Sequence, residues 1–397
     1  MSSFTFHNSE RSTAGCEQRW YLKYGLGITP EVTGKALHVG TVWHKAMEFY
    51  WHSMKDNPEK ALAVALDELE ALRLEELHEH KSTTPDGFNF NTNYGGPSLE
   101  EINNRYVLIV DMLKGYHQKW SNSSESLNLL VLLNEETLQT HIPNHRGRAS
   151  HTKFGGTLDK LVQDKHGQIW VVDHKTTSIS LDVWRRNNQY KPQAVSYVWL
   201  ARRVTEFRPV GIVYDLAIKK VPSQWQDFTV INGNRLSKKL PKNATSESFL
   251  RALKENEFSM DDKPWYRAAY EDLKRSGEQF FKREYIRISE DEINRTEQEL
   301  YAVANKLRHM KNRIGLSARE CLDNIYESTD KETWDRQVLE HVFSNAHKFP
   351  RNGSLCREYF KPCEFMDLCQ SQSKESMRTL VPWTFNMGGY KTADTEK

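Results

Sequence analysis

The sequence contains no apolar run long enough to cross a bilayer. Its longest apolar stretch, LNLLVLL at positions 127–133, is far shorter than the roughly 20 apolar residues that a membrane-spanning helix needs. The start of the chain lacks a basic segment followed by an apolar one, so we expect no secretory signal and a reducing compartment. We therefore expect no disulfides among the five cysteines.

Strong charge imbalance and low complexity are also missing. Lysine and arginine number 55 against 53 acidic residues, and 27% of the 397 residues are charged and 11% aromatic. Such a composition excludes a disordered chain, a collagen-like fibre and a long coiled coil. The length allows two or three domains of about 150 residues, or one large domain with insertions.

The balanced total hides a strongly basic segment. Residues 183–242 contain twelve basic and three acidic residues, a net charge of +9. Aromatic side chains lie among these cations, namely Trp184, Tyr190, Tyr197, Trp199 and Trp225. Cations interspersed with aromatic rings suit phosphates and stacked bases, although a solvated protein face has the same composition. The segment suggests a nucleic-acid partner without establishing one.

Hydrophobic periodicity predicts long helices around a small sheet. Apolar residues recur at helical spacing over 60–77, and capping boxes begin two further helices at Ser98-x-x-Glu101 and Ser289-x-x-Glu292. Short apolar runs bounded by turn residues predict strands at 129–133, 156–162, 169–172 and 210–218. Gly167 suits the positive φ of a hairpin loop between the second and third of these. The pattern predicts an α/β fold with a small mixed central β-sheet surrounded by helices.

Two of the predicted strands carry carboxylates, and the second also carries a lysine. Asp159 lies in the strand 156–162, whereas Asp173 directly follows the run 169–172 and precedes Lys175 by two residues. Because side chains alternate along a strand, Asp173 and Lys175 share one face. Carboxylate oxygens suit Mg²⁺ or Mn²⁺, and a metal-bound water beside a lysine can attack a phosphodiester. We therefore predict a hydrolytic metal site.

Other motifs are weaker when taken singly. The same acid-x-lysine spacing occurs in helical or loop-like surroundings, where a solvated surface pair is the simpler interpretation, at Asp261-x-Lys263, Asp272-x-Lys274 and Glu79-x-Lys81. Two pairs at i, i+4 share a predicted helix face, His44 with Glu48 and Gln193 with Tyr197. A structural histidine and an ordinary amphipathic helix explain these two pairs equally well.

Three cysteines gather near the end of the chain as Cys356-x6-Cys363-x5-Cys369, and Cys16 stands 340 residues before the first of them. Thiols this close in a reducing compartment are typical of metal ligands, and a fourth ligand would complete tetrahedral coordination. Zinc and an iron-sulfur cluster both fit this pattern, and chance clustering of buried structural cysteines is the alternative. Cys321 has no companion.

The order of these motifs resembles the RecB-like branch of the PD-(D/E)XK nuclease superfamily. Cys16 is followed by G-T-x-x-H at 40–44, G-x-x-D at 156–159, V-D-x-K at 172–175, Q-x3-Y at 193–197 and the three later cysteines. In particular, it resembles the iron-sulfur exonucleases typified by the CRISPR-associated RecB-type exonuclease and the nuclease domain of AddB. Leu158 replaces the proline, and Asp173 replaces the glutamate, of the superfamily name.

The resemblance implies a role for each motif. The implied metal ligands are His44, Asp159, Asp173 and the backbone carbonyl of His174. The implied catalytic set is Lys175 with Asp173 and Asp159, supported by Gln193 and Tyr197. Glu135 or Glu136 would supply a further carboxylate. A [4Fe-4S] cluster, with zinc as the alternative, would staple the N- and C-terminal regions through Cys16, Cys356, Cys363 and Cys369. Nucleic-acid contacts are expected from Arg185, Arg186, Lys191, Arg202 and Arg203.

The implied activity is metal-dependent hydrolysis of DNA by an exonuclease, in recombination, repair or phage DNA processing. The expected substrate has single-stranded character or free ends, with protein partners in a recombination or repair complex, and the expected location is the bacterial or phage-infected cytoplasm. We expect a single nuclease domain over 1–397, made of N-terminal motif helices 1–50, a helical insertion 51–125, a catalytic β core 126–220, a mainly helical segment 221–350, the cysteine cluster 351–372 and a tail 384–397. Two alternatives stay open, a catalytically inactive iron-sulfur nucleic-acid-binding or assembly factor and a zinc-stapled structural protein.

Overall fold

The chain forms two compact units in a computed structural model. Unit 1 comprises Met1–Thr33, Thr137–Gly156 and Glu290–Lys397, and unit 2 comprises Gly34–Glu136 and Thr157–Ser289. The structure describes residues 4–25, 28–30, 35–81, 98–121, 129–188, 191–221, 223–276, 280–314, 348–358, 361–366, 369 and 383–385. Cys321, Tyr190 and the predicted tail from residue 386 onward lie outside the described residues.

A mixed sheet has the strand order β1-β4-β5-β6-β9, and β3 also pairs with β4. The central strands β5 and β6 are parallel, and β4 and β9 are their antiparallel outer neighbours. The strand bounds are β1 (Phe4–Phe6), β3 (Leu130–Pro143), β4 (Ala149–Gln163), β5 (Ile169–Thr177), β6 (Gly211–Ile218) and β9 (Phe281–Arg287). The predicted mixed α/β architecture is confirmed. The short strand β1 and the edge strand β9 were not predicted.

Local sequence explains how the inner strands fit together. Every residue of β6 is buried, as expected for a strand covered on both faces. A Cβ on Gly211, at the start of β6, would lie 2.1 Å from the carbonyl oxygen of Ile286 on β9, so only glycine fits there. Gly167 has a φ of +76° in the loop between β4 and β5, which confirms the predicted hairpin.

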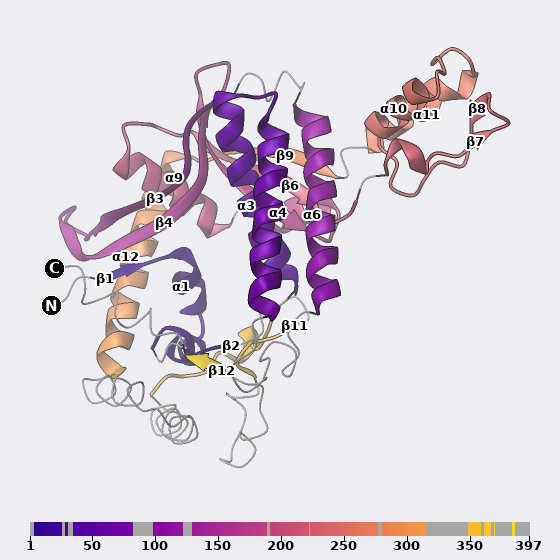
Figure 1. The fold of residues 1–397 in the computed structure, drawn as a ribbon. Helices are drawn as coiled ribbons and strands as arrows, with labels where there is room; N and C mark the ends of the chain where they lie inside the picture. The colour runs from indigo at the N-terminus through magenta and orange to yellow at the C-terminus, as the bar shows by residue number, and fades with distance from the viewer. Residues whose placement is uncertain are drawn as a thin grey trace. The chain divides into compact units, whose positions relative to one another are not determined.

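Three long helices of unit 2 lie side by side, α3 (Lys35–Asp56), α4 (Ala61–Lys81) and α6 (Leu99–Trp120) (Figure 1). The predicted capping box is present at the start of α6, where Ser98 and Glu101 each accept a hydrogen bond from the other's backbone N–H. Edge-to-face ring contacts join the helices, with Tyr116 of α6 5.9 Å from Trp43 and 5.7 Å from Tyr50 of α3 between ring centroids. Helix α3 also packs against β5.

A small substructure with its own core is inserted between β6 and β9. It contains η2 (Trp225–Asp227), β7 (Val230–Ile231), β8 (Arg235–Leu236), α10 (Ser246–Glu255) and α11 (Pro264–Ser276) (Figure 1). Its core is built on Phe228, Leu236, Phe249 and Tyr266. We call residues 223–276 the insertion lobe. Within the described part of unit 2, the other helices are α8 (Leu181–Asn188) and α9 (Pro192–Val204), of which α9 packs on β5 and β6.

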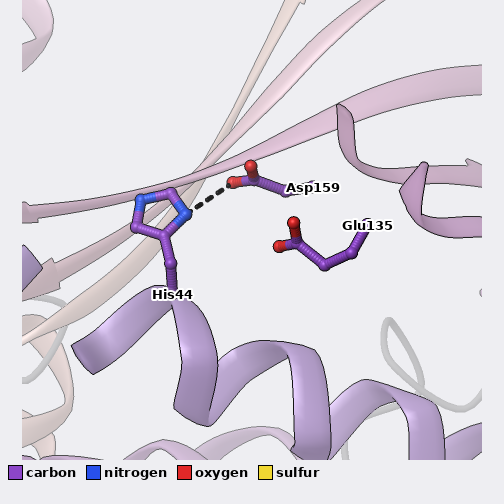
Figure 2. Close-up of side chains that lie close together, drawn as sticks. All are labelled: His44, Glu135 and Asp159. Carbon is purple, nitrogen blue, oxygen red and sulfur yellow. Dashed lines mark ion pairs between the residues drawn. The ribbon is translucent and has the colours of Figure 1, made fainter. Parts of the chain in front are cut away.

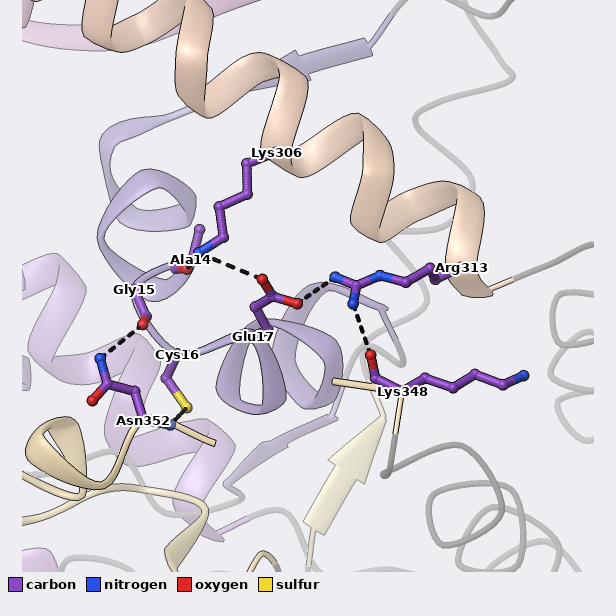
Figure 3. A network of polar contacts seen from close by, with 8 residues as sticks. All are labelled: Ala14, Gly15, Cys16, Glu17, Lys306, Arg313, Lys348 and Asn352. Carbon is purple, nitrogen blue, oxygen red and sulfur yellow. Dashed lines mark hydrogen bonds and ion pairs between the residues drawn. The ribbon is translucent and has the colours of Figure 1, made fainter. Parts of the chain in front are cut away.

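Unit 1 joins N-terminal helices to segments from the other end of the chain. Its elements are α1 (Asn8–Thr13), α2 (Glu17–Trp20), the π-helix η1 (Tyr21–Gly25), β2 (Ile28–Pro30), α12 (Glu290–Ile314), η4 (Gly353–Leu355), β10 (Arg357–Glu358), β11 (Lys361–Pro362) and β12 (Trp383–Phe385). Glu17 forms ion pairs with Lys306 and Arg313 of α12, and Asn352 donates hydrogen bonds toward Gly15 and Cys16 (Figure 3). Within the described ranges, no helix is long and apolar enough to span a membrane.

Candidate active site

The hairpin of β4 and β5 brings the two predicted aspartates onto neighbouring strands. Lys160 pairs with Val172 in the antiparallel register, so Asp159 and Asp173 occupy the next positions along the two strands. Helix α3 supplies His44, and β3 supplies Glu135; both side chains point toward Asp159 in Figure 2. Ligand atoms of His44, Glu135 and Asp159 all lie within 4.8 Å of one another.

Asp159 is held by two donors on the same oxygen. His44 Nδ1 lies 3.2 Å from Asp159 Oδ2, and the backbone N–H of His174 donates to that oxygen at 2.7 Å. Burial alone would raise the pKa of Asp159, but the hydrogen bond and charge of His44 outweigh burial and hold this pKa well below its usual range. Asp159 is therefore an anion whose orientation is fixed.

Glu135 occupies an unusual backbone position in β3. Its φ is +49°, a left-handed conformation that interrupts the regular alternation of the strand. Burial, followed by the nearby charges of Asp159 and Glu48, raises its pKa to about 7. Glu136 is exposed, so of the two glutamates considered from the sequence, the structure brings Glu135 to the site.

Asp173 and Lys175 form a half-buried ion pair on one face of β5. Lys175 Nζ donates to Asp173 Oδ1 at 2.7 Å. Burial opposes the charge of Lys175, but Asp173 and Asp159 outweigh it and raise the lysine pKa. The second oxygen of Asp173, Oδ2, is buried and accepts no hydrogen bond within the described part of the chain. Burial raises the pKa of Asp173, although the charge of Lys175 acts in the opposite direction. A carboxylate oxygen buried without a donor is suited to a cation, which would stabilise its charged form.

Helix α9 places Gln193 and Tyr197 one turn apart. Gln193 Nε2 donates to Tyr197 Oη at 3.2 Å, and Pro192 begins the helix at its first turn. Burial and the charge of Asp173 both raise the pKa of Tyr197, so its hydroxyl stays protonated at neutral pH. The structure thus orients these two side chains relative to each other and brings Tyr197 under the influence of Asp173.

A buried polar network behind the site was missed from the sequence. The side chain of His174 points to the other face of β5, where His174 Nδ1 lies 3.3 Å from Asp215 Oδ2 on β6. Tyr116 donates to the same Asp215 oxygen at 2.5 Å, and Arg283 Nε lies 3.7 Å from the other. Lys160 is also buried, with its ammonium 3.5 Å from the centre of the Trp51 ring. The available sequence signal for this network was a charged residue inside an otherwise apolar strand, such as Asp215 in GIVYDLAI.

Asp215→Asn should destabilise the fold strongly, because it removes the carboxylate that faces Arg283 and His174 in the buried network. Removing one partner of a buried ion pair typically costs about 3–5 kcal/mol. The matched control is Asp261→Asn, which removes an exposed partner of Arg267 and should change the free energy of unfolding by less than about 1 kcal/mol. Urea unfolding measures both variants, and equal midpoints would contradict a stabilising role for the network.

The residues fit a divalent metal. Asp159 and Asp173 are buried carboxylates, Glu135 adds a third carboxylate, and the Asp173 oxygen without a donor provides an unfilled acceptor. Carboxylates with one imidazole suit Mg²⁺ or Mn²⁺ better than softer ions. Asp173 does not belong to the group of atoms within 4.8 Å of one another, and its Oδ1 is paired with Lys175.

The sequence between residues 11 and 370 matches the family model described as the PD-(D/E)XK nuclease superfamily. The chain belongs to the PD-(D/E)XK nuclease superfamily. No curated protein matches the sequence. Membership indicates a metal-dependent nuclease acting on nucleic acid, and it agrees with acidic residues and a lysine on adjacent strands of a mixed sheet.

The PD-(D/E)XK geometry assigns tasks to this chain's own side chains. His44 and the His174 N–H fix Asp159, and Lys175 keeps its positive charge beside Asp173. When bound, a divalent metal would supply Lewis acidity and lower the pKa of a water. An ammonium group at the position of Lys175 could orient a water or stabilise negative charge on a phosphate bound beside Asp173.

The four predicted cysteine ligands line one pocket of unit 1. Cys16 precedes α2, and the pocket wall also contains Cys356, Cys363 and Cys369. Burial raises the pKa of Cys369, and the other three cysteines raise it further. The structure therefore brings these four thiols together, although they come from distant parts of the sequence.

The basic segment divides into structural and exposed parts. Two of the aromatic rings noted in this segment, Trp184 and Trp199, are buried, and Trp184 packs edge-on against Tyr214 at 4.9 Å. Arg202 is half-buried, and its Nε donates to the carbonyl of Pro209. Of the basic residues expected to contact nucleic acid, Arg185, Arg186 and Arg203 are exposed, whereas Lys191 is half-buried.

Proposed function

We propose that the protein is an exonuclease of the RecB-like iron-sulfur branch, which hydrolyses DNA with Mg²⁺ or Mn²⁺. The observation that carries the proposal is the buried, donor-free oxygen of Asp173 next to Lys175 and to the group of His44, Glu135 and Asp159. A non-catalytic descendant of the fold would have no need to keep this combination of buried charges. The ordered motifs from Cys16 to Cys369 support the assignment to this branch.

The proposed metal ligands are His44, Asp159, Asp173 and the backbone carbonyl of His174, with Glu135 as a further carboxylate. Lys175 is the proposed catalytic lysine. Gln193 and Tyr197 would position the strand or the water, since their mutual hydrogen bond orients both side chains and the charge of Asp173 acts on Tyr197. Arg185, Arg186, Lys191, Arg202 and Arg203 are the proposed contacts to the DNA backbone.

We propose a [4Fe-4S] cluster at the four cysteines. The order of the motifs from Cys16 to Cys369 supports this choice, because it resembles that of the RecB-like iron-sulfur exonucleases. The four cysteines line one pocket of unit 1. Tetrahedral zinc at the same cysteines is the alternative.

The proposed setting is DNA recombination, repair or phage DNA processing in the cytoplasm of a bacterium or its infected host. The substrate would carry free ends or single-stranded character. One nuclease domain would comprise the whole chain, with protein partners in a recombination or repair complex.

Digestion of end-labelled DNA tests the proposal. Protein purified without oxygen should be brown, and it should shorten 5′- and 3′-labelled single- or double-stranded DNA with Mg²⁺ or Mn²⁺. EDTA should abolish cleavage, because the carboxylates need a cation to activate water. Progressive shortening from one end indicates an exonuclease, whereas internal cuts in circular DNA would contradict that part. Metal-independent binding without any cleavage would favour the inactive DNA-binding factor.

A further inference from the structure

The insertion lobe presents four exposed cations on a short, ordered stretch. Residues 228–246 contain no acidic side chain, and their basic residues are all exposed, namely Arg235, Lys238, Lys239 and Lys242. No ion pair of any of these four occurs within the ranges that the structure describes. These four exposed cations therefore remain available to an external anion.

The fold holds the backbone of this stretch in place. The β7–β8 hairpin turns through Asn232 and Gly233, which have φ values of +50° and +66°. Leu236 is buried in the lobe core, and its N–H donates to Tyr266 Oη at 2.8 Å. Leu240 packs against the same core. Apolar anchors therefore alternate with the cations and direct them to solvent.

The lobe is rooted at the end of the sheet that carries Lys175. Parallel pairing sets Lys175 opposite Leu216, and β6 ends two residues later at Ile218. There the N–H of Ile218 donates to the carbonyl of Phe280, and the N–H of Lys219 donates to that of Thr177. Both connections of the lobe thus leave the sheet directly beyond the catalytic lysine.

We infer that the insertion lobe is an accessory site for the phosphate backbone of nucleic acid, which binds DNA outside the catalytic centre. The inference rests on the proposed nuclease function for its substrate, DNA. Arg235 on the hairpin and the three lysines that follow it present four exposed positive charges on one ordered stretch, which suits a polyanion such as the phosphate backbone. The other basic side chains of the lobe differ, since they stand among acidic residues on α10 and α11; Arg251 pairs with Glu255 and Arg267 with Asp261.

The test compares two fourfold alanine variants of the full chain. One is R235A/K238A/K239A/K242A, and the matched control is R251A/K254A/R267A/K274A, which removes the same charge from the same lobe. Fluorescence anisotropy with a 40-nucleotide single-stranded DNA in EDTA measures binding without cleavage. The hairpin variant should bind at least about 10-fold more weakly near 0.1 M salt, and its salt dependence should be shallower by about 0.7 for each lost phosphate contact. The control variant should bind nearly as the unmodified protein does.

Equal losses in both variants would show that only net charge matters and would overturn the inference, as would unchanged binding by the hairpin variant. Equal competition by poly-aspartate of matched charge would assign the surface to acidic proteins instead. Cleavage of a six-nucleotide substrate, which offers few phosphates beyond the catalytic centre, should be the same in the hairpin variant and the unmodified protein. If the unmodified protein cleaves nothing but the hairpin variant still loses binding selectively, the nuclease proposal fails and the accessory site stands.

Discussion

Lys175→Ala should lower the rate of DNA cleavage by at least about 10²–10³-fold, the range seen when one group that stabilises transition-state charge is removed. Lys175 is the cation that lies on Asp173, at 2.7 Å, and its raised pKa keeps it charged at neutral pH. Its removal eliminates the positive charge next to the attacked phosphate while leaving every proposed metal ligand in place. Single-turnover cleavage of labelled DNA measures the effect.

Lys274→Ala is the matched control for this variant. Asp272-x-Lys274 has the same spacing as Asp173-x-Lys175, but Lys274 is exposed on α11, so its loss should leave the cleavage rate unchanged. DNA binding in EDTA and the iron content should be normal in both variants. A folded Lys175→Ala protein that cleaves at the unmodified rate would remove Lys175 from the mechanism.

The isosteric change Asp173→Asn separates metal binding from the role of the lysine. An amide oxygen can still accept the hydrogen bond from Lys175, but it lacks the negative charge that a divalent cation needs. Cleavage should fall, and the loss should be partly recovered at high Mn²⁺ concentration. Lys175→Ala should show no such recovery, because its defect is not in metal affinity.

Sequence reasoning predicted the fold where local pattern and long-range structure agree. The apolar runs that became β4, β5 and β6 were recognisable, although β4 extends to Ala149, well before the predicted start at residue 156. The strand β9 was missed because its sequence, FKREYIR, is mostly charged, lacks the alternation of charged and apolar residues that marks an edge strand, and lies next to strongly helical segments. Its pairing with β6 is set by tertiary contact, which no local pattern reveals.

The residues of the candidate site also divide into those that local sequence predicts and those that depend on tertiary contacts. Asp173 and Lys175 could be paired from strand periodicity alone, and the structure gives their contact. The positive φ of Glu135 and the network around Asp215 could not be predicted, since both depend on which residues meet across strands and helices far apart in sequence. The aromatic residues of the basic segment suggested stacking on bases, and the availability of their rings also depends on tertiary structure. Composition shows that rings and cations are neighbours in sequence, but burial decides which rings remain available to bases.

Cys16→Ser should destabilise the protein by several kcal/mol, if the cysteines hold the proposed cluster. Joining Cys16 to Cys356 closes a loop of 340 residues. The chain-entropy model gives about 4.7 kcal/mol for a 100-residue loop and about 0.6 kcal/mol for each doubling, which amounts to roughly 5–6 kcal/mol here. Removing iron with a chelator should lower the free energy of unfolding by a similar amount, because the same link between the chain ends is lost.

Side-chain and backbone contacts also hold the two ends of the chain together in the native state. Tyr21 stacks on Phe349 at 4.2 Å, and the N–H of Gln18 donates to Pro350 at 3.3 Å. These contacts hold the ends together only while the chain is folded, whereas a cluster would also restrict the unfolded chain. The iron-loaded protein should therefore unfold at a higher denaturant concentration than the chelated protein or the Cys16→Ser variant. Cys321→Ser, at the one cysteine without a companion in the motif, is the control and should keep both iron and stability. Equal unfolding midpoints before and after iron loss would show that the side-chain contacts of unit 1, rather than a cluster, join the two ends of the chain.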